Sequence, residues 1–262
     1  MPAPRPTDAA DQTHFPSPRH YAFIHGGGQG SWVWRDTLAE LRQQAGAELG
    51  LLLALDVPGC GVKRGRTTDN LTLPAIAEEL IADITAAGID QVTLVGHSQA
   101  GQVMSLMVAA RPQLFQRLVY LSCSIPLPGQ TVLAMLGSGR HGEQEHEVGW
   151  PLSPQSSTLE QRYRAMFCGD MAAGQAEHFL AQLGADNWPA QSYRFSSWDY
   201  RPHTQVPATF LFCLQDRSLP LHWQAIFAER FNADHRVSID AGHQAMLTRP
   251  HTLAEVLRWL PA

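Results

Sequence analysis

The sequence contains little charge, and its net charge is weakly acidic. Asp, Glu, Lys and Arg make up 16% of the 262 residues, Lys63 is the only lysine, and the net charge is -5. Nucleic acids and anionic membranes both require a clustered basic surface, so neither is expected as a partner. Hydrophobic residues make up 44% of the chain, which is typical of a globular protein that buries its own core.

Cysteines are few and widely separated along the chain. Cys60, Cys123, Cys168 and Cys213 form no C-x-x-C pair and no Cys/His cluster with the spacing of zinc ligands. The sequence therefore predicts no metal site and no cofactor. The four thiols are expected to be small buried residues of a protein in a reducing compartment.

Residues 1–19 lack the apolar stretch of a signal peptide or a membrane anchor. Five of these residues are prolines, which stand among polar side chains. We expect this segment to be a loose tail. With no leader in the sequence, the expected location is the cytoplasm.

Short apolar runs alternate with segments of helical spacing, a pattern typical of a parallel sheet covered by helices on both faces. The predicted strands are residues 21–24, 49–55, 92–95, 118–122, 208–214 and 236–239. The predicted helices cover residues 34–44, 73–87, 103–110, 159–167, 175–183, 221–231 and 252–260. The expected fold is α/β, with a mostly parallel six-stranded sheet formed by residues 20–124 and 203–262.

Residues 125–202 interrupt this alternation because they contain no strand-like run. They could be a helical excursion that only lengthens the core. The alternative that we favour is a cap over the carboxyl edge of the sheet, where open α/β sheets bind ligands. The aromatic side chains that favour a cap are Trp150, Phe167, Phe179, Trp188 and Trp198.

Ser98 lies in the segment G-H-S-Q-A-G, between the apolar run 92–95 and a helical segment. A serine at such a sharp strand-to-helix turn is typical of a nucleophile elbow, in which small neighbours let strand and helix approach. Gly96 satisfies this requirement, whereas Ala100 replaces the usual second glycine and adds one methyl group. The motif alone could also be a glycine-containing loop without chemistry.

A serine hydroxyl needs a base, and the base needs an acid that orients it. His243 follows the last predicted strand and Asp216 follows the strand before it, so both should emerge at the same sheet edge as Ser98. Asp240 is a rival acid, and Asp216 could instead cap the helix that follows it. The chain order Ser98, Asp216, His243 favours a catalytic triad.

The glycine run after the first predicted strand could bring backbone amides close to a substrate oxygen. This run, residues 25–28, lacks the glycine spacing of nucleotide-binding loops. The amide of Gln99, directly after the serine, is the expected partner donor. His25 and Gly26, together with Trp150, Trp188 and Trp198 of the insertion, are expected to contact the substrate.

Four stretches resemble the α/β-hydrolase superfamily, and within it the methylesterase and hydroxynitrile lyase-like group. Residues 25–34 (HGGGQGSWVW) are similar to the start H-G-x-x-x-G-x-W-x-W, and residues 56–61 (DVPGCG) to D-x-P-G-x-G. Residues 96–98 resemble the elbow of that family and residues 241–247 its histidine loop. The resemblance implies that Gly27 and Gln99 donate the oxyanion amides.

The residues beside the first-loop and catalytic histidines separate the esterases from the lyases of this group. The lyases resemble one another in having threonine and lysine where this chain has Gly26 and Gln244. Glutamine cannot supply the positive charge that stabilises leaving cyanide. The sequence therefore favours an esterase over a lyase.

We expect hydrolysis of a small, mostly apolar carboxylic ester through an acyl-enzyme. A lactone or thioester hydrolase, a lyase-like activity and a slowly reacting ligand receptor stay open as alternatives. The expected partner is a small-molecule ester, and the sequence leaves a homodimer open.

Overall fold

The computed structural model describes residues 18–260, and residues 1–17 and 261–262 lie outside the description. The tail predicted for residues 1–19 therefore falls almost wholly outside it. The first strand already begins at Arg19. Among the described residues, no helix has both the length and the apolar character needed to cross a membrane.

The described residues form one sheet of six strands, in which every neighbouring pair is parallel. The strands are β1 (Arg19–Ile24), β2 (Leu49–Leu55), β3 (Val92–His97), β4 (Phe115–Leu121), β5 (Ala208–Cys213) and β6 (His235–Ile239). Their order in space is β2-β1-β3-β4-β5-β6. This arrangement confirms the predicted α/β fold with a parallel six-stranded sheet.

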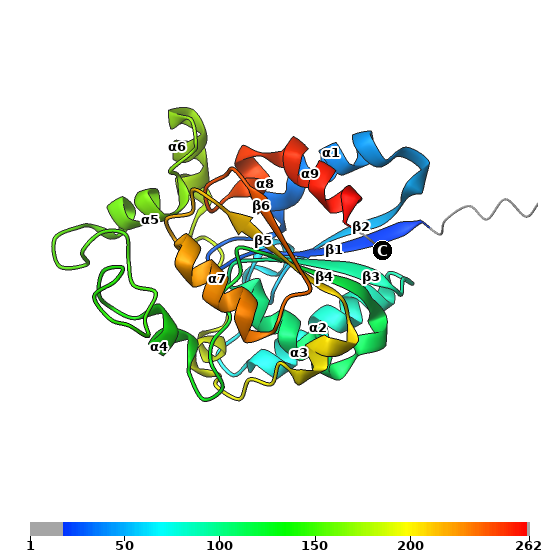
Figure 1. Ribbon diagram of the computed structural model, residues 1–262, viewed down its shortest axis with the longest axis horizontal. Coiled ribbons are helices and arrows are strands. Elements are labelled where there is room, and N and C mark those ends of the chain that lie inside the picture. Colours follow the sequence, from blue (N-terminus) through cyan, green and yellow to red (C-terminus); the bar gives the residue numbers. More distant parts are fainter. Residues whose placement is uncertain (1–17, 261–262) are drawn as a thin grey trace, which may run out of the picture.

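Helices cover both faces of the sheet (Figure 1). On one face lie α1 (Arg35–Ala45), α8 (Ala245–Thr248) and α9 (Pro250–Trp259), and on the other α2 (Leu73–Ala86), α3 (Ala100–Ala110) and α7 (Leu221–Arg230). Successive side chains of a strand point to opposite faces. Tyr21 and Phe23 accordingly pack on the α1 face, and Ala22 and Ile24 pack on the α2 face.

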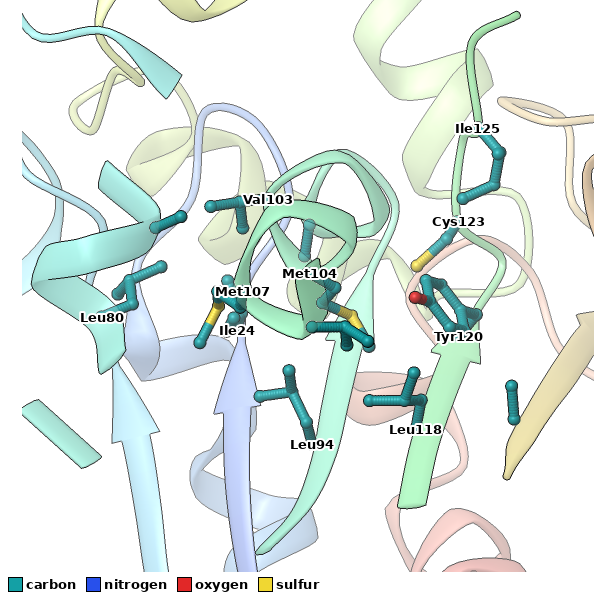
Figure 2. Close-up of a cluster of buried hydrophobic side chains, with 14 of the residues drawn as sticks. Ile24, Leu80, Leu94, Val103, Met104, Met107, Leu118, Tyr120, Cys123 and Ile125 are labelled. Carbon is teal, nitrogen blue, oxygen red and sulfur yellow. The ribbon is translucent and has the colours of Figure 1, made fainter. Parts of the chain in front are cut away.

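The larger core lies between the sheet, α2 and α3 (Figure 2). Ile24 and Leu94 of the strands meet Leu80 of α2 and Met104 and Met107 of α3, and all five side chains are buried. Both faces of each central strand are covered in this way. For this reason the strands appear in the sequence as unbroken apolar runs.

The four cysteines are buried and form no disulfide, as the sequence predicts. Burial raises the pKa of the Cys60 thiol to about 12 and that of Cys168 to about 11. Burial also raises the pKa values of Cys123 and Cys213 well above their ordinary value.

The segment between β4 and β5 contains α4 (Val132–Leu136), α5 (Leu159–Phe167) and α6 (Ala173–Gln182). These helices gather beyond the edge at which the strands end (Figure 1). Phe167 of α5 and Phe179 of α6 form a small separate apolar cluster, whereas Trp188 and Trp198 belong to the larger core. The short helices α4 and α8 were not predicted.

Asp186 ties this segment to the loop after β2. Its buried carboxylate accepts hydrogen bonds from Trp32 Nε1 (3.1 Å), from Gly61 N (2.8 Å), and from Arg64 Nε (2.8 Å) and Nη2 (2.9 Å). Burial alone would raise the pKa of Asp186, but the hydrogen bonds from Arg64, Trp32 and Gly61 hold it below its ordinary value. The carboxylate is therefore charged in the folded protein at neutral pH.

The turn from β3 into α3 needs small residues on both sides of Ser98. A Cβ at Gly96 would lie 2.1 Å from Met104 Sδ and 3.0 Å from the Ala100 Cβ. A Cβ at Gly101 would lie 2.7 Å from the Cys123 Cβ. Because glycine stands opposite Ala100, the methyl group that departs from the family pattern fits.

We expect Gly101→Ala to lower the free energy of unfolding by about 1–3 kcal/mol, because the added methyl group overpacks a rigid contact. Gly174→Ala, the same change in α6, meets nothing within 4 Å. It should raise stability by about 0.4–1 kcal/mol by restricting the unfolded chain. Urea unfolding of both variants checks this expectation, and equal effects at the two glycines would contradict it.

The Asp186 carboxylate should make stability depend on pH in the acid range. A carboxyl whose pKa is lowered by folding stabilises the fold above its unfolded pKa of about 3.8, and this contribution is lost as the pH falls through the folded pKa. Asp186→Asn should therefore cost about 1–3 kcal/mol at pH 7, and the difference from wild type should shrink below pH 4. Asp36→Asn, which changes an exposed carboxylate paired with Arg35, is the matched control. A difference between Asp186→Asn and wild type that stays constant from pH 7 to pH 3 would contradict the prediction.

Candidate active site

Ser98 occupies a strained turn at the carboxyl end of β3. Its φ of 54° lies in the left-handed region, where a non-glycine residue costs about 1–3 kcal/mol. Three backbone hydrogen bonds hold the turn: Ser98 N donates to Leu121 O (3.1 Å), and Ser98 O accepts from Gly101 N (3.2 Å) and Ser124 N (3.0 Å). The turn raises the serine hydroxyl above the end of the sheet.

A continuous chain of hydrogen bonds joins Ser98, His243 and Asp216. His243 Nε2 lies 3.0 Å from Ser98 Oγ, and His243 Nδ1 lies 2.6 Å from Asp216 Oδ2. The carboxylate can only accept, so Nδ1 carries the proton and Nε2 is free to accept from the hydroxyl. The three residues come from the ends of β3, β5 and β6, and the structure brings them together as the sequence predicts.

Asp216 accepts hydrogen bonds at both oxygens. Oδ1 accepts from Ser218 N (2.7 Å) and Leu219 N (2.9 Å), and Oδ2 accepts from Ser122 Oγ (2.5 Å) as well as from His243. These donors fix the orientation of the carboxylate. Ser122 was missed by the sequence analysis, although its place directly after β4 puts it at the same sheet edge.

The geometry does not support the two alternatives to Asp216 as the triad acid, namely Asp240 as the acid and Asp216 as a helix cap. Asp240 is exposed and accepts from Gln215 Nε2 (2.6 Å) instead of approaching His243. The helix α7 begins after Pro220, and no side chain caps its first turn. Asp216 therefore does not serve as the N-cap of this helix.

His97 hydrogen-bonds to the backbone of His243. Its Nε2 donates to His243 O (2.8 Å), and the two rings lie 4.5 Å apart. Burial, followed by the proximity of His243, lowers the pKa of His97 well below its ordinary value. His97 is therefore neutral, and its role is to hold the loop that carries His243 in place.

The side chains of His25 and Trp188 fix the glycine loop after β1 through hydrogen bonds to its backbone. Because Val57 N donates to His25 Nε2 (3.2 Å), His25 Nδ1 carries the proton and donates to Gly26 O (2.8 Å). Trp188 Nε1 donates to the same carbonyl (3.2 Å). Within residues 18–260, the amides of Gly27 and Gln99 have no hydrogen-bond acceptor. Both residues line the cavity beside Ser98.

A cavity of about 250 Å³ opens over Ser98. Its apolar wall comes largely from the segment between β4 and β5. Six residues of this wall are Val132, Leu136, Trp150, Met166, Phe167 and Leu219. Gln29, Gln99 and Gln102 contribute polar groups to the same cavity.

Of the five residues expected to contact the substrate, the structure brings Trp150 alone to the cavity wall. His25 and Trp188 do not line the cavity and instead donate hydrogen bonds to Gly26 O, and Gly26 does not line the cavity either. Trp198 packs on Phe195 and donates to Gln130 O (2.7 Å), away from Ser98. The prediction for these four residues is corrected accordingly.

Gln244, at the position that distinguishes the lyases, does not line the cavity either. Its side chain is fully buried, and neither amide atom has a partner among the described residues.

The chain matches the model of the alpha/beta hydrolase family over residues 22–256. It is 25% identical over 261 residues to polyneuridine aldehyde esterase of Rauvolfia serpentina, a match that covers 91% of this chain and 94% of that protein. It is also 24% identical over 266 residues to methylesterase 10 of Arabidopsis thaliana, with 93% and 92% covered.

Among solved structures, an extracellular α/β-hydrolase from a Paenibacillus species superimposes with a TM-score of 0.73. The superposition covers 92% of this chain and 98% of that one at 19% identity. A match of the family model over most of the sequence agrees with this likeness of fold. The chain therefore belongs to the alpha/beta hydrolase family.

Proposed function

We propose that this protein is a serine esterase that cleaves small, mostly apolar carboxylic esters through an acyl-enzyme. The observation that carries the proposal is the chain of hydrogen bonds from Ser98 through His243 to Asp216, at distances of 3.0 and 2.6 Å. The esterase names of the two relatives support the same reaction class at modest identity.

In the first half of the reaction, Ser98 Oγ attacks the ester carbonyl while its proton passes to His243 Nε2. Asp216 stays ionised and stabilises the imidazolium through Nδ1–H. The developing oxyanion accepts from the amides of Gly27 and Gln99, which need no reorganisation because they bind no other acceptor among the described residues. Collapse of the tetrahedral intermediate breaks the bond to the alcohol, which takes the proton from His243.

In the second half, a water molecule occupies the place of the departed alcohol. His243 accepts a proton from it as it attacks the acyl carbonyl, and the second tetrahedral intermediate collapses to release the acid. The proton returns to Ser98 Oγ, so the enzyme is restored. No step calls for a cofactor.

The cavity supports a small substrate with apolar parts. Its volume of about 250 Å³ is near the lower end of ligand sites, and aromatic and aliphatic side chains form most of its wall. We assign residues 125–202 the role of a cap, because Trp150 and Phe167 of this segment line the same cavity as Ser98. Cytoplasmic location stays a prediction.

Ser98→Ala should reduce turnover of a p-nitrophenyl ester by about 10⁴-fold or more, because the nucleophile is lost. It should also abolish labelling by a fluorophosphonate. Ser197→Ala, which alters an exposed serine, is the matched control and should keep wild-type values. Hydrolysis by Ser98→Ala at the wild-type rate would refute the assignment, and thermal unfolding verifies that both variants are folded.

Asp216→Asn should lower kcat by about 10³- to 10⁴-fold, because an amide at this place favours the wrong imidazole tautomer. Asp240→Asn makes the same change at the rival acid and should leave kcat within about twofold of wild type, as expected for an exposed side chain. Steady-state kinetics on one ester compares the two variants. If Asp240→Asn is the more damaging change, the acid has been wrongly assigned.

A further inference from the structure

Ser122, the first residue after β4, combines a strained backbone with a hydrogen bond to Asp216. Its φ of 39° lies in the left-handed region, which residues other than glycine seldom adopt. The residue is fully buried, and its Oγ lies 2.5 Å from Asp216 Oδ2. Strain of this kind persists only where the surrounding structure imposes it, and it gathers at functional sites.

The strain at Ser122 is matched by the strain at the nucleophile. Four non-glycine residues between 18 and 260 have a positive φ, and two of them, Gln91 and Asn232, are exposed. The other two are Ser98 and Ser122, which directly follow the neighbouring strands β3 and β4. The last residues of these two strands pair with each other, so the two serines stand at the same level of the sheet edge.

The segment after β4 is hydrogen-bonded to both ends of the triad. Leu121 O accepts from Ser98 N (3.1 Å), and Ser124 N donates to Ser98 O (3.0 Å). Between these two contacts, the side chain of Ser122 binds Asp216. Residues 121–124 therefore fix the nucleophile and the acid relative to each other.

The hydroxyl of Ser122 is the donor in its bond to Asp216, because a carboxylate can only accept. The oxygen that it binds, Oδ2, is the one that also accepts from His243 Nδ1 (2.6 Å). The last side-chain torsion of an aspartate is broad, so a carboxylate turns easily unless both of its oxygens are held. Backbone amides hold Oδ1, and Ser122 holds Oδ2 from the side opposite to the chain of proton transfer.

We propose that Ser122 is a positioning residue of the esterase reaction. Its left-handed backbone directs the hydroxyl to Asp216 Oδ2, and this hydrogen bond keeps the carboxylate aligned with the imidazole while His243 takes up and releases its proton. The inference rests on the proposed esterase function and adds to it a residue that acts through the acid without contacting the substrate. Turnover should therefore depend on the hydroxyl of Ser122 and not on the stability of its backbone.

Two substitutions separate the hydroxyl from the backbone. Ser122→Gly and Ser122→Ala both remove the hydroxyl, but glycine adopts the left-handed region readily, so the glycine variant should melt about 2–4 °C above the alanine variant. Both variants should nevertheless lower kcat for a p-nitrophenyl ester by about 10- to 100-fold, because the acid no longer holds the imidazole in place. KM should stay within about twofold of wild type, because both half-reactions pass through His243 and slow together.

Ser105→Ala is the matched control for these variants. Ser105 is also buried, and its Oγ also donates a short hydrogen bond, to Gln102 O (2.6 Å) within α3. The same change at this place should leave kcat within about twofold of wild type. Thermal unfolding checks that all variants are folded, and the glycine variant decides the test if the alanine variant does not fold.

A double-mutant cycle tests whether the hydroxyl acts through the acid. In an Asp216→Ala background, Ser122→Gly should change kcat by less than about twofold, because the hydroxyl has already lost its acceptor. A role in folding alone would lower kcat by the same factor in both backgrounds. Additive effects in this cycle would refute the inference.

Labelling by a fluorophosphonate separates the inference from the function beneath it. In this reaction Ser98 Oγ forms a bond to phosphorus, fluoride leaves, and the hydroxyl proton passes to His243, so its rate reports on the triad without an ester. If Ser122→Gly keeps the wild-type kcat and labelling rate, the role of Ser122 is refuted and the esterase function stands. If the wild type hydrolyses no ester, the proposed function fails. The labelling rates then decide the role of Ser122: they should fall about 10- to 100-fold in both of its variants, and unchanged rates would refute it.

Discussion

The left-handed backbone at Ser98 is the constraint on which the remaining structure depends. A residue keeps this strained conformation only where packing and hydrogen bonds of the surrounding structure hold it there. The strand before the turn approaches the helix after it closely at Gly96, and Gly101 lets the helix approach Cys123 after β4. The carbonyl of Ser98 accepts two amide donors from beyond the turn. The parallel sheet thus fixes the hydroxyl, and the ends of β5 and β6 bring the acid and the base to it.

Two carboxylates of the segment between β4 and β5 hold it on the sheet edge. Asp186 accepts from the loop after β2, and Asp170 Oδ2 accepts from Gly242 N (2.8 Å), the amide directly before His243. Gln175 Nε2 adds a third link, to Leu247 O (2.9 Å). Hydrogen bonds therefore link this segment, which lines part of the cavity, to the loop that carries the histidine.

The sequence predicted what the sheet itself determines. Apolar runs locate the strand ends, and in a parallel sheet these ends share one edge, so the proximity of Ser98, Asp216 and His243 followed directly. No such regularity governs the insertion. Trp150 and Trp188 are both aromatic residues of one irregular segment, and nothing in the pattern separates the one that lines the cavity from the one that supports a loop.

The polar atoms of the cavity were equally hard to predict. Gln99 was expected to act through its backbone, whereas its side chain hydrogen-bonds to Tyr193, a residue distant in sequence. Ser122 could have been found, because a hydroxyl directly after β4 reaches the same edge as the triad. The signal was present in the strand pattern and was not used.

Burial makes the four cysteines poor nucleophiles. A thiol is ordinarily a far better nucleophile than an alcohol at neutral pH, yet only the thiolate reacts, and burial keeps all four sulfurs protonated. The hydroxyl next to an imidazole thus competes with no sulfur for an electrophile that enters the molecule. Reagents that acylate nucleophiles should therefore modify Ser98 and none of the four cysteines.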